Sequence, residues 1–191
     1  NELSQQNIDL VACGEMGIGN TTPASAITAV ICNKAPEEVT GRGTGINEES
    51  LNLKISVIDK SIRLHTPNPT DGIEVLSKIG GFEIGFLAGL MLGCASNNIA
   101  VLIDGFICTA AALIASVINP ISKDYMLGSH QSVEPGHIIA LEHLGIEPLL
   151  NLNLRLGEGT GAALVMPIVE AAMKCLTDMA TFGEAGVSDS S

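Results

Sequence analysis

Short apolar runs alternate along the chain with longer segments whose apolar positions recur every three or four residues. The short runs predict buried strands at 8–13, 100–103 and 125–127, because continuous apolar runs bounded by turn residues are typical of parallel strands. The run 149–154 alternates apolar and polar residues only in part, so its type stays open. The longer segments predict helices at 23–32, 48–65, 72–79, 106–118, 134–144 and 162–180, and a further helix follows residue 81. Asp71 is the predicted cap of the helix at 72–79.

The alternation of strands with helices predicts parallel strands that are joined by right-handed crossovers. We therefore expect the α/β class, as a three-layer Rossmann-like domain with a mostly parallel sheet. The domain should span residues 1–182. The small, acidic residues of 183–191 predict a mobile tail.

Four glycines recur at four-residue intervals in the helix that follows residue 81, at Gly81, Gly85, Gly89 and Gly93. Residues four apart share one face of a helix, so this face should be a flat strip of backbone. Glycine lowers helix propensity, and such a strip is tolerable where another element presses against it. We expect this helix to be closely packed inside the core.

Two stretches share one design, in which a glutamate lies among glycines and a helix follows at once. They are residues 14–19 around Glu15 and residues 157–161 around Glu158. Thr22 is a candidate cap of the first helix, with Pro23 at its first position. Glycines let a ligand approach the backbone, and a helix start directs free N–H groups at an anion. For the Glu158 stretch, a solvated glutamate that complements the helix dipole is about as good an explanation on spacing alone. The occurrence of two such stretches in one small chain is hard to ascribe to chance.

Three further features are candidates for ligand contacts. The stretch 41–45 (GRGTG) is a weak dinucleotide fingerprint but a plausible phosphate loop, because it leads into a helix capped by Asn47. Asp104 follows the end of a strand, where parallel sheets bind their ligands, so it is a candidate site residue. The alternative is that it caps the next helix. The stretch 128–132 is a polar loop at another strand end. For His130, a structural role in this loop explains the sequence at least as well as a ligand contact.

Composition narrows the function classes. The chain has 191 residues, a net charge of −12 and nine basic residues without a cluster, which argues against nucleic acid. A phosphate must then be held by local N–H groups and one or two cations. Five cysteines without C-x-x-C spacing indicate reduced thiols in the cytoplasm. The apolar run 99–118 is broken by Asp104 and Gly105, so we expect no membrane span.

Five motifs carry a resemblance to a known family. They are GEMGIGNTTPASA (14–26), NPTDGIEVLSKIGGFEIG (68–85), VLIDGF (101–106), SHQSVEPG (129–136) and LNLRLGEGTGAALVMPIVEAA (152–172). Over nearly its whole length the sequence resembles nicotinate-nucleotide:dimethylbenzimidazole phosphoribosyltransferases. The resemblance implies transfer of phosphoribosyl from nicotinate mononucleotide to 5,6-dimethylbenzimidazole, giving α-ribazole 5′-phosphate and nicotinate for cobalamin biosynthesis. The alternatives are the same reaction on a purine or phenolic base, and a non-catalytic nucleotide-binding module.

The resemblance also implies roles for particular residues. Glu158 would be the general base, and Glu15 a second carboxylate that steadies the ribose. Lys54, whose alternative is an ordinary surface lysine, would bind the nucleotide phosphate. The other implied substrate-binding residues are Gly17, Asn20, Thr21, Gly43, Asp104, Ser132, Leu156, Gly157 and Gly159. The chemistry needs neither a metal nor another cofactor.

The resemblance implies a homodimer with small-molecule substrates as its other partners. It also implies a small helical lobe built from both chain ends. Family members carry a substantial N-terminal portion that precedes the part seen here, so we expect this lobe to be incomplete. Activity would then depend on that portion.

Overall fold

The computed structural model describes residues 4–187, and its centre is a parallel sheet of four strands. The strands are β1 (Leu10–Ala12), β2 (Ala100–Ile103), β3 (Met126–Ser132) and β4 (Pro148–Leu154), and they lie side by side in that order. Leu10 pairs with Ala100 and Val101 with Met126, so the carboxyl ends of all strands meet at one edge. The predicted α/β class with a parallel sheet is confirmed.

Eight α-helices connect and cover the strands in the described part. They are α1 (Thr21–Ile31), α2 (Pro36–Val39), α3 (Glu48–His65), α4 (Gly72–Ile79), α5 (Phe82–Ser96), α6 (Phe106–Ile118), α7 (Pro135–Leu144) and α8 (Thr160–Asp178). Short 3₁₀ helices span Ser4–Gln6 and Pro120–Tyr125. The predicted bounds of α3, α4 and α6 are confirmed. The predicted caps are also confirmed, because Asn47 accepts from the Ser50 N–H and Asp71 from the Glu74 N–H.

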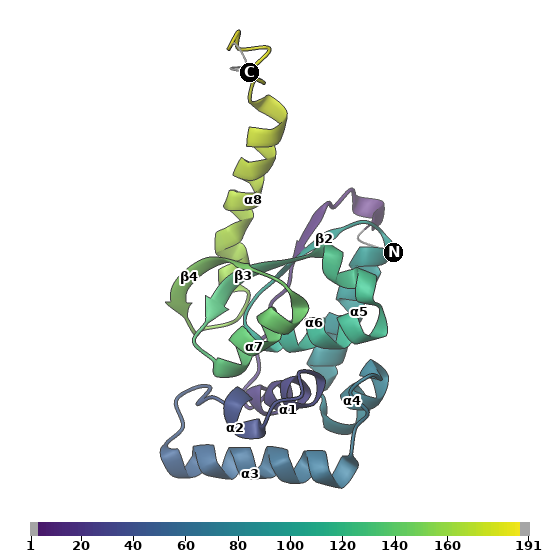
Figure 1. Cartoon of the computed structure of the whole chain (residues 1–191), viewed down its shortest axis with the longest axis vertical. Helices are drawn as coiled ribbons and strands as arrows, with labels where there is room; N and C mark the ends of the chain where they lie inside the picture. Colours follow the sequence, from purple (N-terminus) through teal and green to yellow (C-terminus); the bar gives the residue numbers. More distant parts are fainter. Residues whose placement is uncertain (1–3, 188–191) are drawn as a thin grey trace.

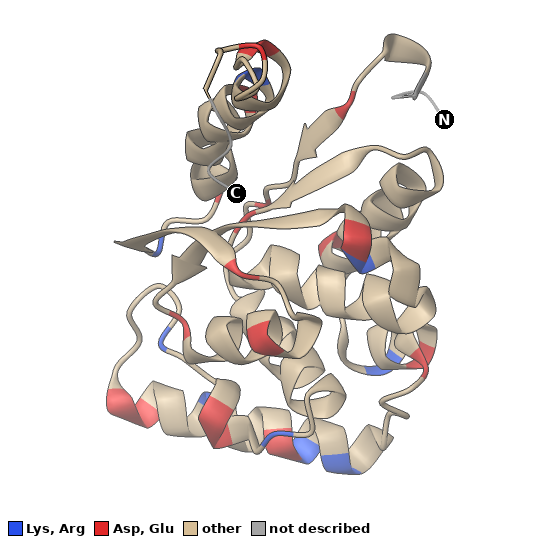
Figure 2. Cartoon of the chain, turned by 45° about the horizontal axis from the view of Figure 1, so that its top comes forward, with Lys and Arg blue, Asp and Glu red and all other residues tan. Residues whose placement is uncertain are grey.

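The main core lies on one face of the sheet, where α6 is surrounded by α1, α4, α5 and α7 (Figure 1). Residues 106–115 of α6 are all buried, which its uninterrupted apolar sequence requires. Helix α3 lies outermost on this side and contacts α1, α2 and α4. Charged side chains lie mainly on the outer helices and in loops (Figure 2). This thick helical layer holds the strand ends in fixed positions.

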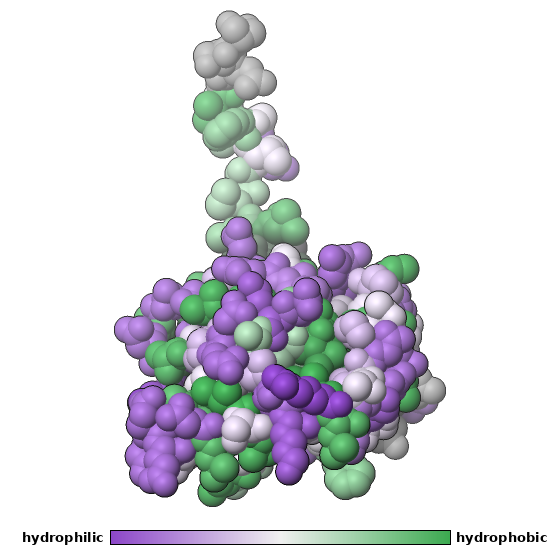
Figure 3. Space-filling view, turned by 60° about the horizontal axis from the view of Figure 1, so that its bottom comes forward, coloured by the Kyte–Doolittle hydropathy of each residue, from purple (hydrophilic) through white to green (hydrophobic). Residues whose placement is uncertain are grey.

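The opposite face of the sheet carries α8 alone among the described elements. Only the first turns of α8 pack on the sheet, where Ala162 and Val165 contact Leu102. The rest projects from the body with much of its apolar surface exposed (Figure 3). Its length and apolar composition would also suffice for a membrane span, but those two properties are shared by helices that pack against protein.

Several predicted boundaries were wrong. Helix α1 begins at Thr21, so Pro23 is not its first residue, and Asn20 instead of Thr22 occupies the cap position. Residues 128–132 belong to strand β3, because they pair with β4, which is itself a strand. Helix α8 runs from 160 to 178 instead of 162 to 180. Of the expected tail, residues 188–191 lie outside the described part.

The expected burial of the glycine strip is also wrong for half of its members. A Cβ atom at Gly85 would meet Leu76 at 3.1 Å, so this glycine does pack inward. Gly89 and Gly93 are exposed, and a Cβ atom there would meet nothing within 4 Å. Periodicity identified the shared face but not which way it points.

Candidate functional site

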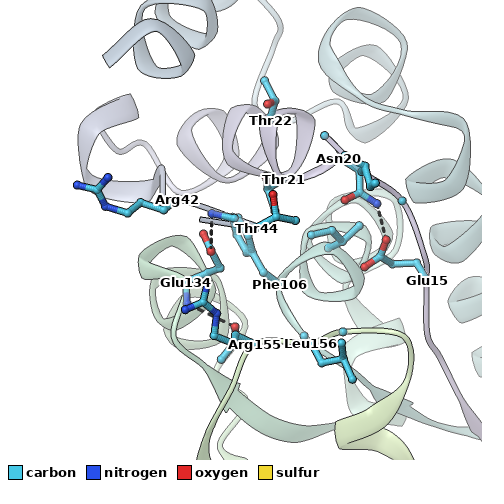
Figure 4. A pocket seen from close by; sticks show the side chains of 18 of the residues that line it. Glu15, Asn20, Thr21, Thr22, Arg42, Thr44, Phe106, Glu134, Arg155 and Leu156 are labelled. Carbon is cyan, nitrogen blue, oxygen red and sulfur yellow. Dashed lines mark hydrogen bonds between the residues drawn. The ribbon is translucent and has the colours of Figure 1, made fainter. Parts of the chain in front are cut away.

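A cavity of about 720 Å³ opens beyond the carboxyl ends of the strands. Five segments line it: the loop after β1 with the start of α1, the loop before α3 with the first part of α3, the start of α6, the end of β3, and the loop after β4. Glu15, Asn20 and Glu134 point toward the cavity, whereas Arg42 and Thr22 point away from it (Figure 4). This is where open parallel sheets bind their ligands.

The two glutamate-bearing glycine turns contact each other at one wall of this cavity. The N–H of Glu158 donates to the carbonyl oxygen of Glu15 at 3.1 Å. A Cβ atom at Gly14 would lie 2.7 Å from the backbone of Gly159, so glycine is required for this approach. Glu158 has a φ of 59°, between Gly157 at 78° and Gly159 at 75°. A left-handed conformation is unfavourable for glutamate and is typical of functional positions.

Glu15 is a half-buried carboxylate whose partner is Asn20. The Nδ2 of Asn20 donates to Glu15 Oε2, which explains why the Asn20 side chain does not cap α1. Burial raises the pKa of Glu15; the Asn20 bond opposes this rise, and the negative charges of Asp104, Glu83 and Glu158 add to it. Glu15 and Glu158 therefore give this wall of the cavity a negative charge, to which Asp104 adds from behind.

The far end of the cavity carries the cations. The Nζ of Lys54 donates to Thr21 Oγ1 at 2.8 Å and to the carbonyl oxygen of Gly41 at 3.0 Å. Burial lowers the pKa of Lys54, and the carboxylate of Glu134 opposes that shift. Arg42 and Arg155 also line the cavity, although the guanidinium of Arg42 pairs with Glu48 and points away from it (Figure 4). In a chain of net charge −12, these cations mark a site for an anion.

Asp104 lies behind the cavity wall and holds the Glu158 turn from beneath. Its side chain is buried, its Oδ2 accepts from the Gly159 N–H at 3.0 Å, and its Oδ1 accepts from the Ala162 N–H at 3.1 Å. A carboxylate at the start of α8 also complements the helix dipole. Asp104 therefore caps α8 and not α6, the helix that follows it in sequence. Its side chain does not line the cavity.

Two buried histidines support the floor of the site. His137 Nδ1 accepts from the Ser132 N–H at 2.9 Å, and burial lowers the pKa of His137 to about 3. His130 Nδ1 lies 3.0 Å from Ser129 Oγ, and burial lowers its pKa while Asp104 opposes the shift. A Cβ atom at Gly161 would overlap the ring of His130, so α8 starts directly against this ring. These contacts favour the structural interpretation of His130.

Most of the predicted site residues line the one cavity. The lining includes Glu15, Gly17, Asn20, Thr21, Gly43, Lys54, Ser132, Leu156, Gly157 and Glu158, whereas Asp104 and Gly159 lie behind it. Sequence reasoning missed Arg42, Glu134 and Arg155. Arg42 lies inside the glycine stretch 41–45 and Arg155 directly precedes the Glu158 turn, so proximity to these motifs was an available signal.

Changing Asp104 to asparagine should weaken both the fold and the placement of Glu158. Asparagine can accept only one of the two N–H bonds, so we expect a loss of about 1–3 kcal/mol in the free energy of unfolding, measured by urea titration. Asp71→Asn is the matched control, because Asp71 caps α4 away from the cavity. Only Asp104→Asn should also lower the rate of the reaction proposed below. An unchanged rate would remove Asp104 from any positioning role.

Comparison with known proteins adds three findings. A family model described as Phosphoribosyltransferase matches residues 1–187. Nicotinate-nucleotide–dimethylbenzimidazole phosphoribosyltransferases are 56% identical over 179 residues in Desulforamulus reducens and 54% identical over 189 residues in Chloroflexus aurantiacus. These matches cover 94% and 99% of this chain but 51% and 54% of the relatives. The chain thus spans about half the length of the curated relatives that it matches.

Solved structures agree with the sequence relatives. The crystal structure of CobT from Thermus thermophilus superposes with a TM-score of 0.91 at 44% identity, covering 98% of this chain and 57% of that one. A second structure from the same organism, named as the nicotinate-nucleotide–dimethylbenzimidazole phosphoribosyltransferase, gives a TM-score of 0.88 at 43% identity and covers 97% of this chain and 54% of that one.

Proposed function

Because the chain belongs to the phosphoribosyltransferase family that includes the nicotinate-nucleotide–dimethylbenzimidazole enzymes, we propose that the protein transfers phosphoribosyl from nicotinate mononucleotide to 5,6-dimethylbenzimidazole. The products are α-ribazole 5′-phosphate and nicotinate, as part of cobalamin biosynthesis in the cytoplasm. The five cysteines are free thiols, which supports the cytoplasmic location.

The observation that carries this proposal is the polarity of the cavity. Lys54, Arg42 and Arg155 lie toward one end, and Glu15 and Glu158 form the opposite wall. Nicotinate mononucleotide has a matching polarity at its reacting centre, because its phosphate is a dianion and the ring nitrogen bonded to the ribose is a pyridinium cation, while the carboxylate of the ring lies further from the ribose. The cationic end suits the phosphate, while the two carboxylates suit the positive charge that the ribose gains as its bond to nicotinate breaks.

The reaction is a displacement at the anomeric carbon of the ribose. The carbon–nitrogen bond breaks and its electron pair leaves with nicotinate, while one benzimidazole nitrogen forms the new bond from the opposite face. The proton of the other benzimidazole nitrogen goes to Glu158 as the general base. Glu15 stabilises the positive charge on the ribose. Lys54, Gly17 and the loop that contains Gly43 receive the phosphate, and Ser132 contacts the nucleotide.

The test is a product assay in which nicotinate mononucleotide is offered with 5,6-dimethylbenzimidazole, a purine or a phenol. Release of nicotinate with formation of α-ribazole 5′-phosphate is the expected result. Preferential reaction with the purine or the phenol would reassign the acceptor. Binding of the nucleotide without nicotinate release from any mixture would favour a non-catalytic module.

We further propose that the protein is a homodimer and that α5 forms its contact. The exposed residues of this helix are Phe82, Phe86, Gly89, Gly93 and Ser96, which lie on one face. A two-fold axis midway between Phe86 and Gly89 places each phenyl ring of one protomer against a glycine of its partner. Such a self-complementary patch is what a two-fold interface needs.

Phe86→Asp should convert this dimer into a monomer at micromolar concentration, as measured by light scattering. The side chain of Phe86 is 72% exposed, so the fold should survive the change. Gly89→Leu should dissociate the dimer in the same way and leave the melting temperature of the protomer unchanged or higher, because no atom lies near its Cβ position. Leu64→Asp is the control, since Leu64 is 71% exposed on the distant α3. A wild-type monomer would contradict the proposal.

A further inference from the structure

One carboxylate lies at the cationic end of the cavity, where a phosphate site should have none. Glu134 directly precedes α7, and its side chain reaches the loop 41–45. Its Oε1 accepts from the Gly43 N–H at 2.9 Å, so the proposed phosphate donor is already engaged (Figure 4). A negative charge here opposes phosphate binding. Its presence therefore needs a reason that outweighs that cost.

The geometry around Glu134 indicates a fixed position. Its Oε2 is buried and has no hydrogen-bond partner among residues 4–187. A Cβ atom at Gly41 would overlap this oxygen, so the loop backbone lies directly against the carboxylate. An oxygen that no solvent reaches cannot bind a substrate hydroxyl without rearrangement. Glu134 is thus built into the loop instead of facing the ligand.

The loop is held from two directions by groups of opposite charge. Lys54 donates to the carbonyl oxygen of Gly41, and Glu134 accepts from the N–H of Gly43. Between them the chain makes a tight turn, in which the Gly45 N–H donates to the carbonyl oxygen of Arg42 at 3.0 Å. Gly43 has a φ of 55°, which glycine adopts without strain. Arg42 adds to this turn by donating to the carbonyl oxygen of Ile46 and by pairing with Glu48, so Lys54 and Glu134 anchor an already folded turn to the rest of the site.

We propose that Glu134 is a positioning residue that fixes the loop 41–45 in the shape that receives the phosphate. The inference rests on the proposed function, because it takes this loop as part of the phosphate site. Glu134 acts through the backbone of Gly43 and through its charge on Lys54, and it does not touch the substrate. Burial lowers the pKa of Lys54, and the carboxylate of Glu134 opposes that shift.

The test compares Glu134→Ala, Glu134→Gln and the control Glu142→Ala, which removes an exposed carboxylate from α7, the helix that follows Glu134. Two quantities are measured on the 191-residue chain: amide exchange at Gly43, and affinity for inorganic phosphate and nicotinate mononucleotide by calorimetry. Glu134→Ala should speed Gly43 exchange and weaken both ligands about tenfold, because the loop loses its clamp. Glu134→Gln keeps an acceptor oxygen for Gly43 and should recover most of that loss.

The outcomes separate this inference from the proposed function. Tighter phosphate binding in both Glu134 variants would overturn the positioning role, since it would show a carboxylate that merely competes with phosphate. Unchanged Gly43 exchange and unchanged affinity in Glu134→Ala would also overturn it. A wild-type chain that binds neither phosphate nor the nucleotide would refute the phosphate site itself, and the role of Glu134 would fall with it.

Discussion

Replacing Glu158 with glutamine should lower turnover by roughly 10²–10⁴, the usual contribution of a positioned general base. Glutamine keeps the size and hydrogen-bonding reach of the side chain but cannot accept the benzimidazole proton. Binding of nicotinate mononucleotide should persist, because the proposed phosphate contacts are made by other residues, chiefly Lys54. The loss of turnover should shrink as pH rises, since the azole then loses its proton more easily without help.

Steady-state rates and calorimetric binding on an active preparation decide this prediction. Glu170→Gln is a suitable control, because Glu170 is an exposed carboxylate on the same helix as the Glu158 turn. If Glu158 only complements the dipole of α8, its substitution should cost about 0.3–1 kcal/mol of stability and leave turnover near wild type. Normal turnover in Glu158→Gln would end the assignment of the base.

Removing the ammonium group of Lys54 should produce the second large effect, on binding of the nucleotide. A charge-assisted hydrogen bond to phosphate contributes about 1.5–3 kcal/mol, so Lys54→Ala should raise the KM for nicotinate mononucleotide roughly 10- to 150-fold. Lys54 is half-buried against Thr21 and Gly41, which fixes its position before substrate arrives.

Lys60→Ala provides the comparison for Lys54, since Lys60 is exposed on the same helix. It removes the same charge from the same element without touching the cavity. Initial rates across a range of nucleotide concentrations measure both variants. Equal KM values for the two variants would show that Lys54 does not bind the phosphate and is an ordinary surface lysine.

Sequence patterns predicted the elements that are defined by local rules. The periodicity of α3 and the caps at Asn47 and Asp71 fixed two helices to the residue, because capping and amphipathicity act within one turn. The exposure of Gly89 and Gly93 escaped the same reasoning. An apolar helix face that meets a partner has the same composition as one that meets the core, so only the tertiary arrangement distinguishes them.

The site shows the same division between local and long-range information. The two glycine turns could be predicted from the sequence, because each combines a carboxylate, glycines and a helix start within a few residues. Their mutual contact through Glu158 and Glu15 joins segments far apart in the chain. The role of Asp104 at the start of α8 likewise depends on which strands are neighbours. No single stretch of the sequence encodes that strand order.

The orientation of bound nicotinate mononucleotide tests the polarity of the cavity, on which the assignment of every site residue depends. A crystal structure of the chain with this nucleotide would measure it directly. We expect the phosphate within hydrogen-bonding distance of Lys54, with the anomeric carbon and pyridinium ring beside Glu15 and Glu158. A phosphate located beside the two glutamates, or a nucleotide bound outside the cavity, would contradict this polarity.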